Sequence, residues 1–111
     1  MQQLNRKEIG RRIRSQREIL GITREAMAEA LEVTAKFLAD IELGNKGLST
    51  QTLYSVSQYL TMTTDYILTG WEYDPSVDEK IKPLTMMLKA CKPEKLKYAE
   101  ALMRDFIASL D

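Results

Sequence analysis

The spacing of apolar residues constrains this chain most, because it is helical almost from end to end. Apolar side chains recur three and four residues apart, as on one face of an α-helix, and strand-like alternation is weak. No Asn-Gly or Asp-Gly pair marks a tight β-hairpin. The pattern therefore predicts an all-α fold.

Start and stop signals divide residues 1–70 into five predicted helices. Asn5, Thr23 and Thr34 are residue types that cap helix N-termini, and Gly44 is a typical C-terminal stop. The expected helices span residues 6–20, 24–31, 35–43, 50–60 and 65–68. The side chains expected to face inward include Ile9, Ile13, Arg17, Leu20, Met27, Ala28, Leu31, Leu38, Ile41, Leu53, Val56 and Leu60. Residues 1–70 are predicted to form one compact domain.

A second helical region follows a linker predicted at residues 71–77. Ser76 and Glu79 have the spacing of a capping box, so a helix is expected to start there. Pro83 is expected to kink or restart this helix, and Pro93 suits the first position of another. Residues 78–111 are therefore predicted to form a helical hairpin with an apolar stripe on each helix.

Composition argues against most catalytic chemistry. The chain of 111 residues is 44% hydrophobic and 29% charged, which suits a globular protein, and it has one cysteine and no histidine. These counts exclude the usual zinc sites, thiol–histidine nucleophiles and histidine acid–base pairs. No catalytic, metal-binding or cofactor-binding residue is predicted, and an enzyme is not expected. Since no signal peptide or membrane segment is visible, a cytoplasmic location is expected.

Charge is balanced overall but not along the chain. The 16 Lys and Arg residues oppose 16 Asp and Glu residues, which argues against a non-specific nucleic-acid binder but not against a specific one. Basic residues gather near the N-terminus, at Arg6, Lys7, Arg11, Arg12, Arg14 and Arg17. They either face a nucleic acid or form a solvated helix face.

Two opposite charges are expected on inward-facing stripes. Arg17 lies on the stripe of the first helix, and Glu42 lies one turn beyond Leu38 on the third. Burying either charge alone costs several kcal/mol, so the two are expected to pair. The alternative is that each reaches solvent separately.

The segment from Arg17 to Gly44 carries a distinctive combination of residues. Its members are Arg17–Thr23, Met27, Ala28, Leu31, Val33, Thr34, Leu38 and Ile41–Gly44, with Leu60 and Thr64–Gly70 closing the pattern. With these residues, positions 9–70 resemble the phage-repressor and Cro-type helix-turn-helix family, also called the xenobiotic-response-element family. The resemblance implies a regulator that binds double-stranded DNA, with the Arg17–Glu42 pair bracing the first helix against the third.

In this family the third helix lies in the major groove and the second crosses the DNA backbone. The DNA-facing side of residues 35–43 is then the side opposite Leu38 and Ile41. Helix N-termini and the loop after the third helix are expected to meet phosphates. The predicted DNA-binding residues are Thr23, Arg24, Thr34, Ala35, Lys36, Phe37, Ala39, Asp40, Asn45, Lys46 and Thr50. Among them, Lys36 is expected to donate to guanine and Asp40 to accept from cytosine.

The sequence departs from the family pattern at three points. Arg24 replaces the usual glutamine, and Glu32 stands at a turn position that is usually glycine, where it must adopt a left-handed backbone. Residues 35–43 also contain few hydrogen-bond donors, and Phe37 can be a core residue or an anchor for a protein partner. The alternative function is therefore an interaction module that does not bind DNA, such as an antirepressor or adaptor.

The predicted hairpin suits a homodimer, because its apolar face is broader than one partner helix needs. The residues expected at the dimer interface are Leu84, Leu88, Leu102, Met103, Phe106, Ile107 and Leu110. The alternatives are packing within the chain and a methionine-lined groove for another protein. A homodimer would read a near-palindromic operator with half-sites about 34 Å apart. Repression by occluding a promoter is the expected activity.

Overall fold

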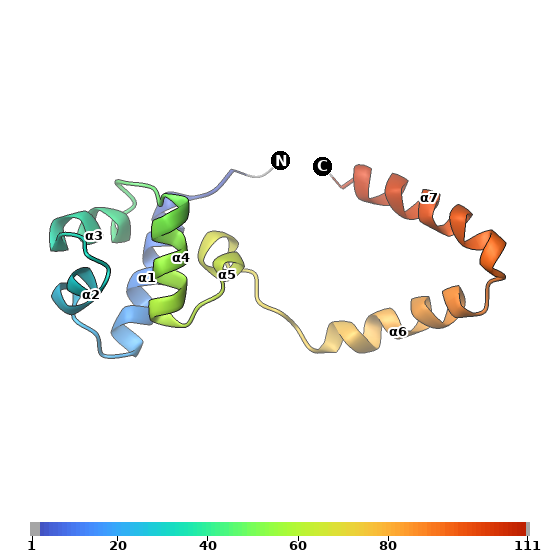
Figure 1. Cartoon of the computed structure of the whole chain (residues 1–111), viewed down its shortest axis with the longest axis horizontal. Helices are drawn as coiled ribbons and strands as arrows, with labels where there is room; N and C mark the ends of the chain where they lie inside the picture. The colour runs from blue at the N-terminus through green and yellow to red at the C-terminus, as the bar shows by residue number, and fades with distance from the viewer. Residues whose placement is uncertain (1–2, 111) are drawn as a thin grey trace. The chain divides into compact units, whose positions relative to one another are not determined.

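The computed structural model describes residues 3–110, and every regular element in that range is helical (Figure 1). The chain divides into two compact units, with the boundary between Glu72 and Tyr73. The N-terminal unit contains α1 (Arg6–Ile19), α2 (Arg24–Ala30), α3 (Ala35–Glu42), α4 (Thr50–Leu60) and α5 (Thr64–Thr69). The C-terminal unit contains α6 (Ser76–Lys89), a 3₁₀ turn (Pro93–Lys95) and α7 (Leu96–Ala108). The predicted fold class, five helices followed by a helical hairpin, is confirmed.

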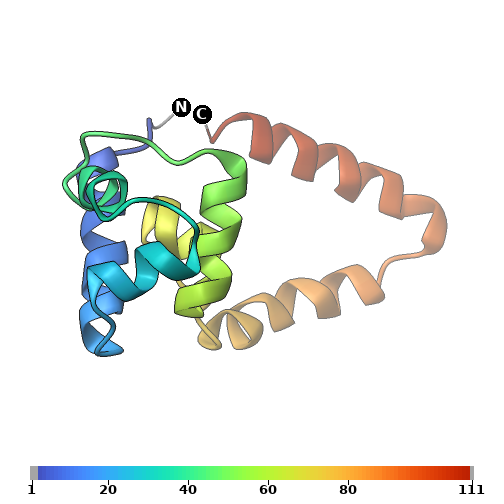
Figure 2. The same cartoon turned by 60° about the vertical axis from the view of Figure 1, so that its left-hand side comes forward.

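One apolar core joins the five helices of the N-terminal unit. α1 packs against α3, α4 and α5, and α2 packs against α3 (Figure 2). The buried apolar side chains are Ile9, Ile13, Met27, Ala28, Leu38, Ile41, Val56, Leu60 and Ile67. Leu31 and Leu53 are half-buried at the margin of this core. The apolar stripes predicted along the sequence therefore meet in one interior.

The prediction for Leu20 is wrong. Its side chain is 47% exposed, because α1 ends at Ile19 and Leu20 forms the C-cap rather than a further turn of the stripe. The chain turns away at Gly21, which has a left-handed backbone.

Side-chain caps start the helices of the N-terminal unit. The predicted caps Asn5, Thr23 and Thr34 each accept a hydrogen bond from the backbone N–H three residues later. α4 begins at Thr50, as predicted, and its cap is Ser49. Ser49 was missed because several consecutive Ser and Thr residues can each cap a helix.

The start of the C-terminal unit differs from the prediction. Ser76 is the first residue of α6 and not its cap, so the predicted capping box with Glu79 is wrong. The carboxylate of Asp74 accepts the Ser76 backbone N–H instead, at 2.9 Å. α6 continues through Pro83 without a restart, and Pro93 begins the 3₁₀ turn that precedes α7. On an exposed helix, water can satisfy the carbonyl that Pro83 leaves without a donor.

The C-terminal unit lacks a buried core. None of the residues described in α6, the 3₁₀ turn or α7 is buried, and only Ala99 is half-buried. Large apolar side chains stand open along both helices, up to 71% exposed at Leu102. No helix within residues 3–110 has the length and apolar character needed to cross a membrane.

Candidate nucleic-acid interface

α2, a tight turn and α3 form a helix-turn-helix. Ala28 is almost fully buried where the two helices meet, and its carbonyl accepts the Val33 backbone N–H at 2.9 Å. Glu32 occupies the turn with φ 58°, the left-handed conformation that its place in the sequence requires. A non-glycine residue in this conformation costs about 1 kcal/mol. The small residue and the strained turn together set the angle at which α3 leaves α2.

A buried ion pair joins α1 to the end of α3. Arg17 donates from Nε to Glu42 Oε2 at 2.7 Å and from Nη2 to Glu42 Oε1 at 2.9 Å. Its third nitrogen, Nη1, donates to the Ile22 carbonyl at 3.0 Å. The hydrogen bond that Arg17 donates to Glu42 raises the pKa of Arg17 above its usual value. The structure thus brings together the two charges that the sequence paired, in the bidentate geometry that arginine favours.

Arg24 adds a second cation to this pair. Its Nε and Nη2 lie 3.3 and 3.1 Å from Glu42 Oε1, the oxygen that also receives Arg17. The Arg24 side chain is 33% exposed, whereas that of Glu42 is fully enclosed. Arg24 was predicted to meet DNA, and its guanidinium here links the first turn of α2 to α3. A DNA contact by Arg24 therefore requires it to release or share Glu42.

Close backbone contact between α1 and α3 depends on a glycine that sequence reasoning missed. A Cβ atom on Gly10 would lie 2.4 Å from the carbonyl oxygens of Ile41 and Glu42. The signal was available, because Gly10 interrupts a helix beside the inward-facing Ile9. A Cβ atom on Gly44, whose φ is 80°, would lie 2.8 Å from the Cα atom of Lys7. Two glycines thus let α3 lie directly against α1.

The outer side of α3 is open, but only part of it is fully exposed. Thr34 and Lys36 are exposed, and the Lys36 side chain is 85% accessible. The predicted residues Ala35, Phe37, Ala39 and Asp40 are half-buried, and Phe37 packs against the core. Around them, Thr23, Asn45, Lys46 and Thr50 are exposed. Lys36 is thus the most accessible hydrogen-bond donor among the predicted residues of α3.

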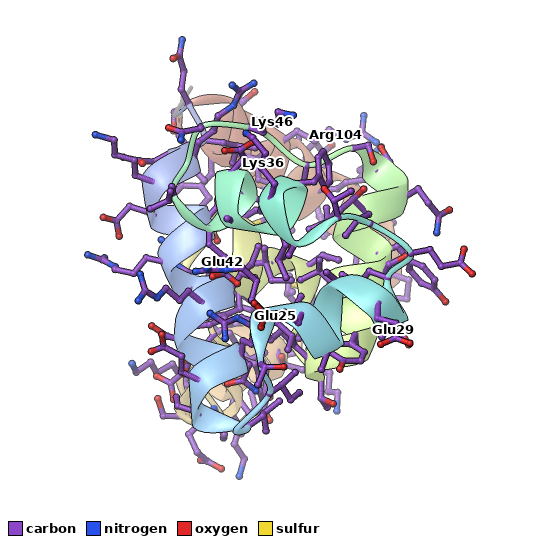
Figure 3. The ribbon with its side chains drawn as sticks, turned by 90° about the vertical axis from the view of Figure 1, so that its left-hand side faces the viewer. Glu25, Glu29, Lys36, Glu42, Lys46 and Arg104 are labelled. Carbon is purple, nitrogen blue, oxygen red and sulfur yellow. The ribbon has the colours of Figure 1, made fainter. Side chains whose placement is uncertain are left out.

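Asp40 organises the loop that follows α3. Its carboxylate lies 3.3 Å from the Lys36 ammonium and 3.8 Å from that of Lys46, and its carbonyl accepts the backbone N–H groups of Asn45 and Lys46. The Lys46 ammonium also sits 5.2 Å from the centre of the Phe37 ring. Asp40 was predicted to accept a hydrogen bond from cytosine. Here it places two lysines side by side at the end of the unit (Figure 3).

The neighbouring face of α2 is acidic. Glu25 and Glu29 lie on α2, below Lys36 and Lys46 in Figure 3, and both glutamates are exposed. Glu32 adds a third exposed carboxylate at the turn. Within the helix-turn-helix, attraction to phosphates therefore comes from Lys36 and Lys46 on α3 and the following loop, and the carboxylates of α2 and the turn oppose it.

This geometry, two short helices joined by a tight turn with the second one open on its outer side, defines a helix-turn-helix unit. Residues 10–72 match the family described as "Helix-turn-helix domain". The chain belongs to this helix-turn-helix domain family. The family and the similar regulator and repressor structures support a DNA-binding regulator.

Individual proteins show the same likeness. The uncharacterized HTH-type transcriptional regulator YazB of Bacillus subtilis (strain 168) is 36% identical over 56 residues, covering 50% of this chain and 81% of YazB. The clp gene regulator ClgR from C. glutamicum is 32% identical with a TM-score of 0.54, over 60% of this chain and 86% of ClgR. The P22 c2 repressor, solved with a synthetic operator, is 27% identical with a TM-score of 0.55, over 57% of this chain and 96% of the repressor.

Proposed function

We propose that this protein is a transcriptional repressor that binds a near-palindromic operator as a homodimer, with α3 in the major groove. The observation that carries the proposal is the open side of α3, braced from behind by the Arg17–Glu42 pair and carrying the exposed Lys36. A recognition helix must present donors on one side and be held rigidly on the other. The likeness to the P22 c2 repressor, whose structure includes an operator, supports this assignment.

In the proposed complex, α3 reads bases and the surrounding groups hold phosphates. Lys36 turns from Asp40 to the O6 and N7 acceptors of a guanine. Lys46 and Asn45 contact the backbone from the loop, and exposed N–H groups at the starts of α2 and α4 receive phosphates. Asp40 then has two roles. It accepts a hydrogen bond from cytosine, and it positions the side chains of Lys36 and Lys46.

The homodimer in this proposal forms through the hairpin. An isolated pair of helices with no buried side chain cannot offset the entropy of its own folding. Of the predicted interface residues, Leu84, Leu88, Leu102, Met103 and Phe106 line one open groove of about 450 Å³. Ile107 and Leu110 are also exposed, outside this groove. A second copy would cover these surfaces and give each monomer a linked DNA-binding partner.

Selection of bound fragments from random duplex DNA tests the proposal. We expect enrichment of an inverted repeat with half-site centres about 34 Å apart, one helical turn. On the selected duplex, Lys36→Ala should weaken binding and relax preference at one base pair per half-site. The matched control Lys82→Ala removes an exposed lysine from α6 and should leave affinity nearly unchanged. Unchanged affinity and unchanged base preference in the Lys36→Ala variant would contradict the assigned groove face.

The acidic face of α2 favours a second candidate, a helix-turn-helix module that binds a protein and not DNA. Glu25, Glu29 and Glu32 would repel phosphates beside α3. The neighbour solved as a SinR protein/SinI protein complex, 20% identical with a TM-score of 0.53, shares the fold. Titration at two salt concentrations separates the candidates, because DNA binding must weaken steeply with salt. If no duplex binds at low salt, the second candidate replaces the first.

A further inference from the structure

The two ends of the helical hairpin carry opposite charge. At the turn end, residues 89–97 contain Lys89, Lys92, Lys95 and Lys97 against a single acidic residue, Glu94. At the open end, residues 73–80 and 104–110 contain Asp74, Asp78, Glu79 and Asp105 against the two basic residues Lys80 and Arg104. All of these side chains belong to exposed residues. The hairpin therefore has a basic tip and an acidic base at the two ends of one apolar groove.

The helix dipole explains this pattern in α6 but not in α7. In α6 the acidic residues Asp78 and Glu79 lie in the first turn and Lys89 in the last, which is the favourable arrangement. In α7, Lys95 and Lys97 lie at the N-terminal end, where the helix dipole disfavours cations. Farther along the helix, Arg104 pairs with Glu100, and Asp105 follows it. The two lysines at the start of α7 would therefore gain from an acidic partner outside the helix.

We propose that the hairpin groove is covered by the hairpin of a second copy lying antiparallel, so that the basic tip of each meets the acidic base of the other. This inference rests on the homodimer of the proposed function and specifies how it is built. In a two-fold symmetric pair, the basic tip of the first copy meets the acidic base of the second, and the basic tip of the second meets the acidic base of the first. The pair therefore has two equivalent attractive contacts. A parallel pair would instead bring tip against tip and base against base, with like charges adjacent at both ends.

The antiparallel arrangement also fits the groove. Its floor is apolar along both helices, from Ile81 and Leu84 on α6 to Leu102 and Phe106 on α7. Four helices packed around such a floor form a bundle with crossing angles of about 20°, in which antiparallel neighbours are common. Because α6 has 14 residues, the two tips lie roughly 21 Å or more apart at about 1.5 Å per residue. Tips and bases alternate at each end of the bundle.

Cross-linking through the natural cysteine tests the arrangement directly. Cys91 is exposed at the tip. A second chain, Cys91→Ser with Ser76→Cys, moves the thiol to the base. We expect that a short bismaleimide links neither chain to itself, but links the two after subunit exchange. Sedimentation first establishes that both chains are dimers.

The outcomes separate this inference from the homodimer itself. Efficient Cys91–Cys91 cross-linking in a dimeric chain overturns the antiparallel arrangement and leaves the homodimer standing. If the two chains are dimers and exchange subunits but their mixture gives no cross-link, the antiparallel arrangement is likewise overturned and the homodimer stands. A natural chain that sediments as a monomer overturns the homodimer and the arrangement together.

Charge neutralisation provides an independent readout. Lys92→Gln with Lys95→Gln removes two lysines from each tip, so four weak attractions are lost and the dimer dissociation constant should rise by about tenfold. In a parallel dimer the same change relieves repulsion and tightens association. The matched control Arg11→Gln with Arg14→Gln removes the same charge from α1, and the dissociation constant should not change. Tighter association of the tip variant overturns the proposal.

Discussion

The two units of this protein are both helical but differ in how they are stabilised. The N-terminal unit buries apolar side chains from all five helices and encloses an arginine–glutamate pair. The C-terminal unit buries none of its described residues, although its helices carry as clear an apolar stripe. The comparison shows that amphipathic helices alone do not make a buried core. Their apolar stripes must also pack against one another. The first unit encloses a core of its own, whereas the helices of the second leave their apolar stripes exposed.

The largest expected effect comes from breaking the hairpin association. Leu102→Asp with Phe106→Asp places charges in the apolar groove, so the chain should become monomeric and lose about 100-fold or more in operator affinity as linkage is lost. The N-terminal unit should still unfold cooperatively at the same temperature. Sedimentation, fluorescence anisotropy and calorimetry measure the three properties. Retained dimerisation in this variant would mean that the hairpin does not form the interface.

The next largest effect is expected from Glu42→Ala. Removing this carboxylate leaves Arg17 buried without its partner, which should lower the free energy of unfolding by about 3–5 kcal/mol. Arg24, partly exposed, can turn to solvent and adds little to the loss. Denaturant unfolding measures the change, with Glu29→Ala as the control on the exposed side of α2. A loss equal to that of the control would show that the brace does not stabilise the unit.

A smaller loss is expected from Gly10→Ala. The added methyl group meets two backbone carbonyl oxygens of α3, so α1 and α3 must separate, at about 1–3 kcal/mol. Alanine normally favours a helix over glycine, so an increase in stability would contradict the close contact. Dimerisation measured by sedimentation should not change, because Gly10 lies in the unit that encloses its own core.

The smallest effect is a gain, expected from Glu32→Gly. Glycine adopts the left-handed backbone of the turn without strain, so the free energy of unfolding should rise by about 1 kcal/mol or less. Glu29→Gly is the matched control, since it places glycine inside α2 and should cost about 1 kcal/mol. If both changes destabilise the protein equally, the turn at Glu32 is not strained. Neither change should alter hairpin association.

Much of the N-terminal unit was predictable because local signals and burial agree there. Asn5, Thr23 and Thr34 cap the helices that they were expected to cap, and the stripe through Ile9 and Ile13 faces the core. Local signals failed where a helix ended one residue early, as at Leu20. The capping box at Ser76 failed because Asp74 supplied an alternative acceptor.

The candidate interface was predicted less completely. Sequence spacing identified the open side of α3, but it could not reveal that Arg24 contacts Glu42 or that Lys46 lies near Asp40. These contacts join residues from different helices or across a loop, and only folding brings them together. Because of these contacts, Arg24 and Asp40 already have charged partners. To bind either side chain, DNA must share that partner or displace it.

The sequence alone determined which segments are helical, where most of them begin, and that residues 9–70 follow a helix-turn-helix pattern, because helix periodicity and capping act over three or four neighbouring residues. Only the tertiary structure decided how closely α1 meets α3 at Gly10, which partners the interface charges have, and which apolar stripe lacks a cover. Those properties depend on distances between residues far apart in the chain, and close packing of the core sets these distances.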